Sequence, residues 1–246
     1  MMEVSEPLDF EHKDRKDIYE FVERHGTVPK EKAYEELFSR EERRFRHQLA
    51  LLKRDGYIEE NDGVLRVSFE PHGKKEDFEE GEIGFTIRPA RQEDLGGVIS
   101  AIREVVEEKR HIVAESVAEQ IDHQDVLLRH NEIGSRVFFV ALVEEDVVGW
   151  AHIEAKEMDK LSHTAEVTFG VIEEYRGNGV GKRLFERTLE WSSSKGYEKL
   201  YQSVPATNEE AIEFLERNGC EVESRRKRHY KIGGEYVDEV MLAIYL

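Results

Sequence analysis

The sequence predicts an α/β (α+β) fold: a mixed central sheet flanked by helices and preceded by a small domain of helices and a hairpin. Three observations predict it. Residues 137–142 and 147–154 are rich in β-branched and aromatic residues and are joined by a polar turn, which predicts an antiparallel pair. Later strands alternate with helical segments, which is typical of parallel pairing. The charged, glycine-bearing and non-periodic stretch 70–82 predicts a linker between two domains.

The first seventy residues predict three helices and a hairpin. Residues 14–25 carry apolar side chains at helical spacing, and Gly26 ends that helix. Pro29 stands where a second helix can begin. A third helix covers 40–55, and two short strands lie within 56–67 around an Asn-Asp-Gly turn.

The order of these elements resembles a winged helix-turn-helix domain over residues 10–69. Its recognition helix would be residues 40–54, where six Lys and Arg stand against two Glu, a net of +4 in a chain of −18. DNA contact through Arg43, Arg44 and Arg46 is one interpretation. A solvated helix that pairs with acidic residues, or a protein-interaction module, is the other.

After the linker, residues 83–246 predict the central sheet. A strand over 85–90 is followed by helical segments over about 92–131 and then by the antiparallel pair. The remaining elements are a fourth strand (164–172), a helix (180–195), a fifth strand (199–204), a helix (208–218) and two closing strands (near 221–230 and 235–245).

A loop with three glycines, Gly177, Gly179 and Gly181, separates the fourth strand from its helix. Glycine leaves the backbone open to close approach, and the N–H groups of the loop and helix N-terminus converge on one spot, which favours a phosphate. A Walker loop would need Ser or Thr where Arg183 stands, and a dinucleotide fingerprint would need G-x-G-x-x-G spacing. An ordinary glycine-rich turn is the alternative.

The pattern Arg176-x-x-Gly179-x-Gly181 resembles the acetyl-CoA loop of the GNAT (GCN5-related) N-acetyltransferases, and the resemblance covers residues 83–246. It implies acetyl-CoA as co-substrate, no metal, and a pantetheine arm between the fourth and fifth strands. The cofactor-binding residues that it implies are Phe169, Val171, Arg176, Gly177, Asn178, Gly179, Val180, Gly181, Lys182 and Asn208, with Arg183 as a further charge partner.

The reaction that the resemblance implies is attack of a neutral amine on a thioester. An alkylamine of pKa ~10 must first lose a proton, and a carboxylate that takes it contributes roughly 10²–10⁴ in rate. Glu166 lies on the fourth strand where many family members keep this base; an outward, solvated residue is the alternative. His152, His163 and Glu154 are further candidates, interpreted as surface or edge residues. The amide of Val171 could polarise the thioester carbonyl.

The proton donor usual in this family is absent from its expected place. Counting from Asn208, the usual tyrosine position holds Leu215, which cannot donate a proton. Because a thiol of pKa ~8.5 leaves tolerably as thiolate, activity is not excluded. Tyr201, Tyr230 and Tyr236 are candidate replacements.

Acceptor choice falls to the helices after the first strand and to the last hairpin. Both are acidic, with Glu104, Glu107, Glu108, Glu115, Glu119, Glu235, Asp238 and Glu239. An acidic mouth favours cationic amines, and a generally acidic surface is the alternative. The sequence thus predicts an N-acetyltransferase acting on a small-molecule amine, a protein lysine or an N-terminus. The rival is a DNA-binding regulator whose second domain senses acyl-CoA with little catalysis.

The composition sets wider bounds on function. With 54 acidic against 36 basic residues, wholesale affinity for nucleic acid or acidic membranes is disfavoured. The single cysteine, Cys220, excludes an internal disulfide and a cysteine-based zinc site. No stretch approaches ~18 apolar residues, and the N-terminus is charged, so a soluble, cytoplasmic chain without a membrane partner is expected. A homodimer stays open.

Overall fold

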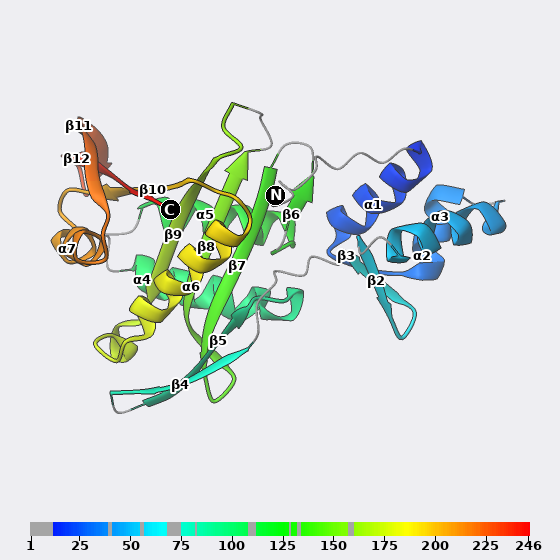
Figure 1. Ribbon diagram of the computed structural model, residues 1–246, viewed down its shortest axis with the longest axis horizontal. Coiled ribbons are helices and arrows are strands. Elements are labelled where there is room, and N and C mark those ends of the chain that lie inside the picture. The colour runs from blue at the N-terminus through cyan, green and yellow to red at the C-terminus, as the bar shows by residue number, and fades with distance from the viewer. Residues whose placement is uncertain are drawn as a thin grey trace.

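The computed structural model describes residues 12–38, 41–54, 57–67, 75–81, 83–107, 112–127, 129–131, 134–156 and 160–246. These residues form two sheets and seven α-helices (Figure 1). One sheet has three strands in the order β1-β3-β2. The other has nine, in the order β11-β12-β10-β9-β8-β7-β5-β4, with β6 paired to β7. The predicted mixed central sheet flanked by helices is confirmed.

The smaller sheet belongs to the N-terminal part. Its elements are α1 (Lys13–His25), β1 (Thr27–Pro29), α2 (Lys30–Phe38), α3 (Glu42–Arg54), β2 (Ile58–Asn61) and β3 (Val64–Val67). Strand β1 was not expected from the sequence. Val28 pairs with Leu65 across it, so Pro29 ends a short edge strand and α2 begins one residue later. Phe45 and Leu52 of α3 are buried in the core of this part.

The nine-stranded sheet is flanked by four helices. Its strands are β4 (Glu76–Glu80), β5 (Ile83–Pro89), β6 (Arg129–Asn131), β7 (Gly134–Val143), β8 (Asp146–Lys156), β9 (Thr164–Val171), β10 (Lys199–Pro205), β11 (Glu221–Ile232) and β12 (Glu235–Tyr245). The helices are α4 (Leu95–Val106), α5 (Ile112–Gln124), α6 (Val180–Ser194) and α7 (Glu209–Arg217). Among these strands β9 and β10 form the parallel pair.

The two faces of this sheet have different helical covers (Figure 1). On β7, successive side chains alternate between faces: Phe138 packs with Ile102 of α4, and Phe139 packs with Leu184 of α6. Helices α4 and α5 therefore cover one face, and α6 covers the other. We call the first the α4/α5 face.

Strand β4 lies inside the segment that the sequence assigns to a linker. Phe78 stacks on Phe85 at 5.3 Å between ring centroids, and Glu80 accepts a hydrogen bond from Arg183 Nε of α6 at 2.6 Å. These partners stabilise a strand whose local composition is acidic. Arg183 lies about a hundred residues later in the chain, so this contact could not be predicted from the sequence around the strand.

The helical region expected over 92–131 ends earlier, since α5 stops at Gln124 and residues 129–131 pair with β7. Residues 70–74 and 82 of the expected linker lie outside the described residues. No helix in the described part of the chain combines the length and apolar character needed to cross a bilayer.

Candidate active site

The site begins where two neighbouring strands part. Strands β9 and β10 are paired at three positions, the last of which joins Glu166 to Tyr201. Beyond this pair β9 continues to Val171 and β10 to Pro205 without pairing to each other. A cavity of about 290 Å³ opens between them, lined by residues 168–171 and 202–205. We call the Glu166–Tyr201 end its closed end.

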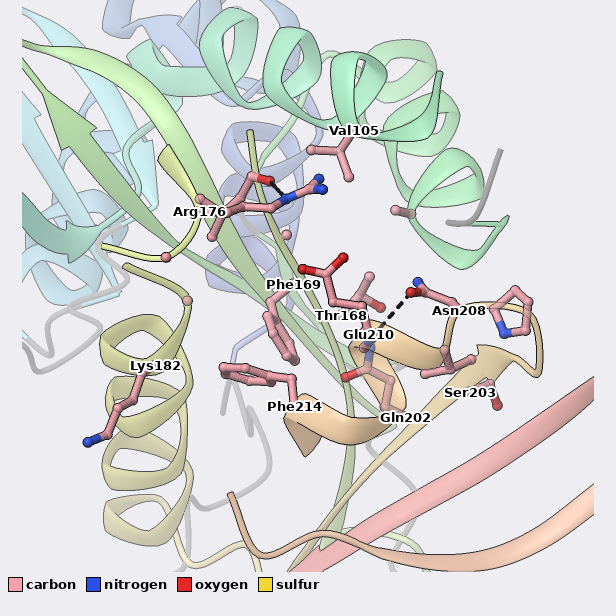
Figure 2. A pocket seen from close by; sticks show the side chains of 18 of the residues that line it. Val105, Thr168, Phe169, Arg176, Lys182, Gln202, Ser203, Asn208, Glu210 and Phe214 are labelled. Atoms are coloured by element: carbon pink, nitrogen blue, oxygen red, sulfur yellow. Dashed lines mark hydrogen bonds between the residues drawn. The ribbon is translucent and has the colours of Figure 1, made fainter. Parts of the chain in front are cut away.

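The rest of the cavity wall comes from the glycine loop and from four helices. The loop and the start of α6 contribute Arg176, Gly177, Gly179, Gly181 and Lys182. Helix α7 contributes Glu210, Ala211 and Phe214 together with its N-cap Asn208, and α4 and α5 contribute Val105 and Ala114. Phe169 and Phe214 face each other across an apolar part of the wall, 5.4 Å between centroids (Figure 2).

The loop conformation requires two of its glycines. Gly177 and Gly179 have φ of 76° and 82°, a left-handed conformation that glycine adopts without steric cost. Gly179 is also the N-cap of α6 and has no side chain to bond the first N–H groups of that helix. At Gly181 an added Cβ would lie 3.6 Å from Val171 Cγ2, an ordinary contact. The chain's own packing therefore does not require glycine at 181.

Eight of the ten residues predicted to bind the cofactor line this cavity, and Asn178 and Val180 lie outside the lining. Val180 is buried in the core beneath the loop. Asn178 Nδ2 donates to the carbonyl of Arg176 at 3.2 Å and so braces the loop.

Two lining side chains are held by local hydrogen bonds. Arg176 Nε donates to the carbonyl of Val171 at 2.9 Å (Figure 2), and Asn208 Oδ1 accepts from Ala211 N at 3.2 Å as the N-cap of α7. Their roles toward a ligand stay predictions.

The two cations that follow the loop have different surroundings. Arg183 bonds Glu80 and Glu186 and lies over the Phe78 ring, which occupies its guanidinium within the protein. Lys182 is 58% exposed, 3.7 Å from Glu186, and in Figure 2 its side chain points outward from α6. Of the two, Lys182 is the residue that lines the cavity.

Glu166 stands at the closed end of the cavity, outside its lining. It alternates with Val167, which packs toward α6, so its side chain lies on the α4/α5 face with Thr168. Burial raises the pKa of Glu166, the neighbouring Glu154 and the more distant Glu239 raise it further, and Lys156 lowers it. A carboxyl with a raised pKa is a better proton acceptor than a solvated one.

His152 differs from its expected place at the surface. It is 2% exposed, and its ring packs against Phe138 at 4.7 Å between centroids. Burial, with a contribution from the cation of Arg136, lowers the pKa of His152 to about 3, so the ring is neutral at physiological pH. His163 is exposed, and the Glu154 side chain is 45% exposed.

No proton donor comes from the usual position on α7. Leu215 is buried in an apolar cluster with Phe185 and Val204. Among the candidate tyrosines, Tyr201 pairs with Glu166, and Tyr230 Oη donates to Glu239 Oε1 at 2.9 Å. Tyr236 is 57% exposed.

The last hairpin is less acidic than the sequence analysis expected. Glu239 is buried and bonds Arg226, and Asp238 accepts from the backbone N of Arg228 at 2.8 Å. The run of basic residues 225–229 could have indicated this pairing. Glu108 of the other acidic group lies outside the described residues.

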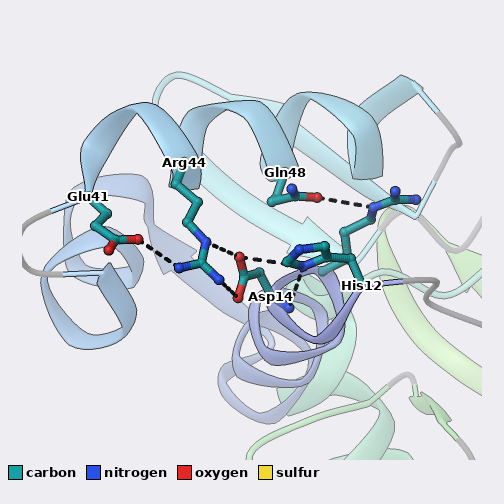
Figure 3. A network of polar contacts seen from close by, with 6 residues as sticks. His12, Asp14, Glu41, Arg44 and Gln48 are labelled. Atoms are coloured by element: carbon teal, nitrogen blue, oxygen red, sulfur yellow. Dashed lines mark hydrogen bonds and ion pairs between the residues drawn. The ribbon is translucent and has the colours of Figure 1, made fainter.

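The candidate DNA-contacting arginines on α3 are engaged to different extents. Arg44 bonds both carboxylate oxygens of Asp14 on α1, and its Nη1 donates to Glu41 at 2.8 Å (Figure 3). Arg46 pairs with Glu42 at 2.5 Å. Among the described residues, no ion pair involves Arg43.

Comparison with known proteins shows what this part of the chain is similar to. Residues 101–220, which include the glycine loop and Asn208, match the model of the acetyltransferase (GNAT) family. The thialysine N-epsilon-acetyltransferase of Mus musculus is 25% identical over 170 residues, 63% of this chain and 95% of the relative.

Solved structures share the fold. A GNAT-family acetyltransferase from Streptococcus pneumoniae is 19% identical with a TM-score of 0.55, over 66% of this chain and 99% of that one. A structure from Salmonella typhimurium, solved with its cofactor acetyl-CoA, is 16% identical with a TM-score of 0.52, over 66% and 94%. The part of the chain that carries the nine-stranded sheet and the cavity is thus similar to acetyltransferases of the GNAT family in sequence over residues 101–220 and in fold.

Proposed function

We propose that this protein is an acetyl-CoA-dependent N-acetyltransferase that moves an acetyl group directly to a primary amine. The separation of β9 and β10 beyond Glu166 carries the proposal, because it opens a cavity with a glycine loop on its wall and a carboxylate at its closed end. The match of residues 101–220 to the GNAT family model and the name of the mouse relative support the same activity.

The residues around the cavity fit acetyl-CoA. The first N–H groups of α6 and the loop after Arg176 suit its pyrophosphate, with Lys182 as the nearby cation. Past Glu166, the described part of β9 has no strand partner on its β10 side, so its peptide groups suit the pantetheine amides. Gln202 Oε1 is buried and, among the described residues, has no hydrogen-bond partner, which adds an acceptor to the wall.

In this proposal, the chain's own residues remove a proton from the acceptor amine. Acetyl-CoA supplies an activated thioester. The amine nitrogen bonds to its carbonyl carbon, the carbon–sulfur bond breaks, and Glu166 accepts the proton that the amine loses. Tyr201, paired with Glu166 at the closed end, lies on the same side of the sheet.

Acetyl-CoA titration by calorimetry, paired with free-thiol release over a panel of amines and lysine peptides, tests this function. Binding with turnover that falls roughly 10²–10⁴-fold in Glu166→Gln is expected. Glu190→Gln, which replaces an exposed glutamate on α6, is the control and should match the wild type. Absence of acetyl-CoA binding would refute the proposal.

A second candidate function has support from the N-terminal part. The order α1, β1, α2, α3, β2, β3 and a core of its own favour a winged helix-turn-helix-like domain, so an acyl-CoA-sensing DNA-binding regulator is the rival. Tight acetyl-CoA binding without thiol release on any acceptor, together with salt-dependent DNA affinity, would favour it.

A further inference from the structure

A row of polar side chains crosses the α4/α5 face at the closed end of the cavity. The strand registers pair Arg136 of β7 with Glu154 of β8, Glu154 with Glu166 of β9, and Glu166 with Tyr201 of β10. Cross-strand neighbours of this kind have Cβ atoms about 5 Å apart. Two carboxylates, one of them the proposed base, are therefore adjacent.

His152 lies next to this row, two residues before Glu154 on the same face. Its Nε2 is 4.0 Å from Glu154 Oε2, and neither ring nitrogen has a hydrogen-bond partner among the described residues. Contact with Phe138 explains why the ring is buried but not why its nitrogens are unpaired. Such orphaned polar atoms are rare and costly, and Glu154 is the carboxylate that this imidazole can reach with a small movement.

We propose that Glu154 and His152 are positioning residues for proton removal: the Glu154 carboxylate, the cross-strand neighbour of Glu166, makes Glu166 a stronger base, and His152 keeps the Glu154 side chain at that place. This inference rests on the proposed function, in which Glu166 takes the proton of the amine. Glu154 does not touch the substrate; it acts through its neighbour on β9.

The other titratable groups around Glu166 are less suited than Glu154 to make Glu166 a stronger base. Lys156, also on β8, acts in the opposite direction. Glu239 of β12 is held by Arg226 and by Tyr230 of β11, which offset its charge. Tyr201 on β10 is neutral, since burial raises its pKa, and Glu166 and Glu154 raise it further. From α4 and α5 the residues at the cavity are Val105 and Ala114, which carry no charge.

The partial exposure of Glu154 suits this role. A fully buried second carboxylate would protonate instead of Glu166, whereas one that keeps contact with water stays ionised.

The pH dependence of kcat/KM tests the proposal, because it reports ionisations of the free enzyme. In Glu154→Gln, Glu166 ionises beside a neutral neighbour, so the acidic limb of the profile moves to lower pH, and the plateau falls less than about tenfold because the base is weaker. Glu154→Asp keeps the charge and should leave the limb in place. Lys156→Gln should move the limb to higher pH, the opposite sign.

His152→Phe tests the second residue and keeps the ring stacked on Phe138. Without the imidazole the Glu154 carboxylate can turn away from Glu166, so the limb moves in the same direction as in Glu154→Gln but less. A purely structural role for His152 would change the melting temperature and leave the limb in place.

A carboxyl-carbon NMR titration of Glu166 in the wild type and in Glu154→Gln gives the same comparison without turnover. An unchanged titration midpoint and an unchanged limb in Glu154→Gln would overturn the proposal while the acetyltransferase function stands. Full activity in Glu166→Gln would instead overturn the assignment of the base.

Discussion

Positions 179 and 181 show how one motif joins two different physical requirements. Gly179 has φ of 82°, so the protein's own backbone conformation requires glycine, and a Cβ there would also displace the end of the Glu80 side chain. Gly181 lies in the first turn of α6 with ordinary space around it. A glycine that the protein itself does not need fits the close approach of a ligand.

Alanine substitutions separate these requirements. Gly179→Ala should lower the free energy of unfolding by about 1–2 kcal/mol, the cost of a left-handed non-glycine residue, and weaken acetyl-CoA binding. Gly181→Ala should stabilise the protein by about 0.4–1 kcal/mol, because it restricts the unfolded chain at a helical position. Urea unfolding and calorimetry measure both. Equal stability of the two variants would contradict this account of the loop.

Cys220 provides a second prediction at residue scale. Burial raises the pKa of its thiol to about 11, so iodoacetamide should label it slowly at pH 8 and quickly once the protein unfolds. The folded protein holds the thiol proton more tightly than the unfolded chain, whose thiol pKa is ~8.5. The stability from this group is thus complete below pH ~8.5 and falls as pH rises toward 11.

The labelling rate as a function of urea concentration checks this, since the chain has one cysteine. Rapid labelling at pH 8 without denaturant would show that the region around Cys220 opens locally.

At the scale of elements, α7 contributes its N-cap residue to the cavity and an apolar face to the core. Its N-cap Asn208 lines the cavity, and Leu215 packs against Phe185, Val204 and Val240. The position that carries a tyrosine in many family members therefore belongs to the core of this chain.

Restoring that tyrosine should not restore a proton donor. Leu215→Tyr adds volume and a hydroxyl to a packed cluster, and the expected cost is about 1–3 kcal/mol of unfolding free energy without faster thiol release. Leu215→Ala, which leaves a cavity, should cost about 2–5 kcal/mol. Thermal unfolding and thiol release compare the two. A faster Leu215→Tyr enzyme would show that the side chain reaches the leaving thiol.

The sequence predicted the strands with strong apolar patterns and the glycine loop, because these signals are local. β4 was not predicted, because its local composition is acidic and Arg183, which bonds its Glu80, is distant in the chain. The burial of His152 depends on how β7, β8 and β9 align, and the cavity depends on where β10 leaves β9. Sequence patterns therefore indicate candidate residues for a site, whereas the registers of the strands determine which of these residues lie next to each other.

At the scale of the whole molecule, the described residues bury their apolar side chains in separate cores. One cluster contains only residues between Ile18 and Leu65, and the clusters of the nine-stranded sheet begin at Phe85. Gly26, after α1, meets the Gln92 side chain, where an added Cβ would lie 3.2 Å from Cδ. The N-terminal part therefore has a core of its own while its Gly26 lies next to the part with the nine-stranded sheet.

If that partner is DNA, the arginines of α3 should respond differently to substitution. Arg43→Gln removes one phosphate contact, so the decrease of log K with log salt concentration should become shallower by about 0.9. The melting temperature should stay unchanged. Arg44→Gln should lower the melting temperature, since it leaves the buried carboxylate of Asp14 without the guanidinium that joins α1 to α3. Fluorescence anisotropy over a salt series, with thermal unfolding of each variant, measures both.

Lost DNA affinity in Arg44→Gln alone would reflect a damaged fold, so Arg43→Gln decides. A salt slope that Arg43→Gln leaves unchanged would exclude this helix as the phosphate contact. If acetyl-CoA changes the DNA affinity, linkage requires DNA to change the acetyl-CoA affinity by the same factor. That reciprocal titration separates a regulator from an enzyme that only carries a DNA-binding domain. If each ligand changes the affinity for the other by the same factor, and this factor differs from one, regulation is supported. A factor of one means that the two parts bind their ligands independently.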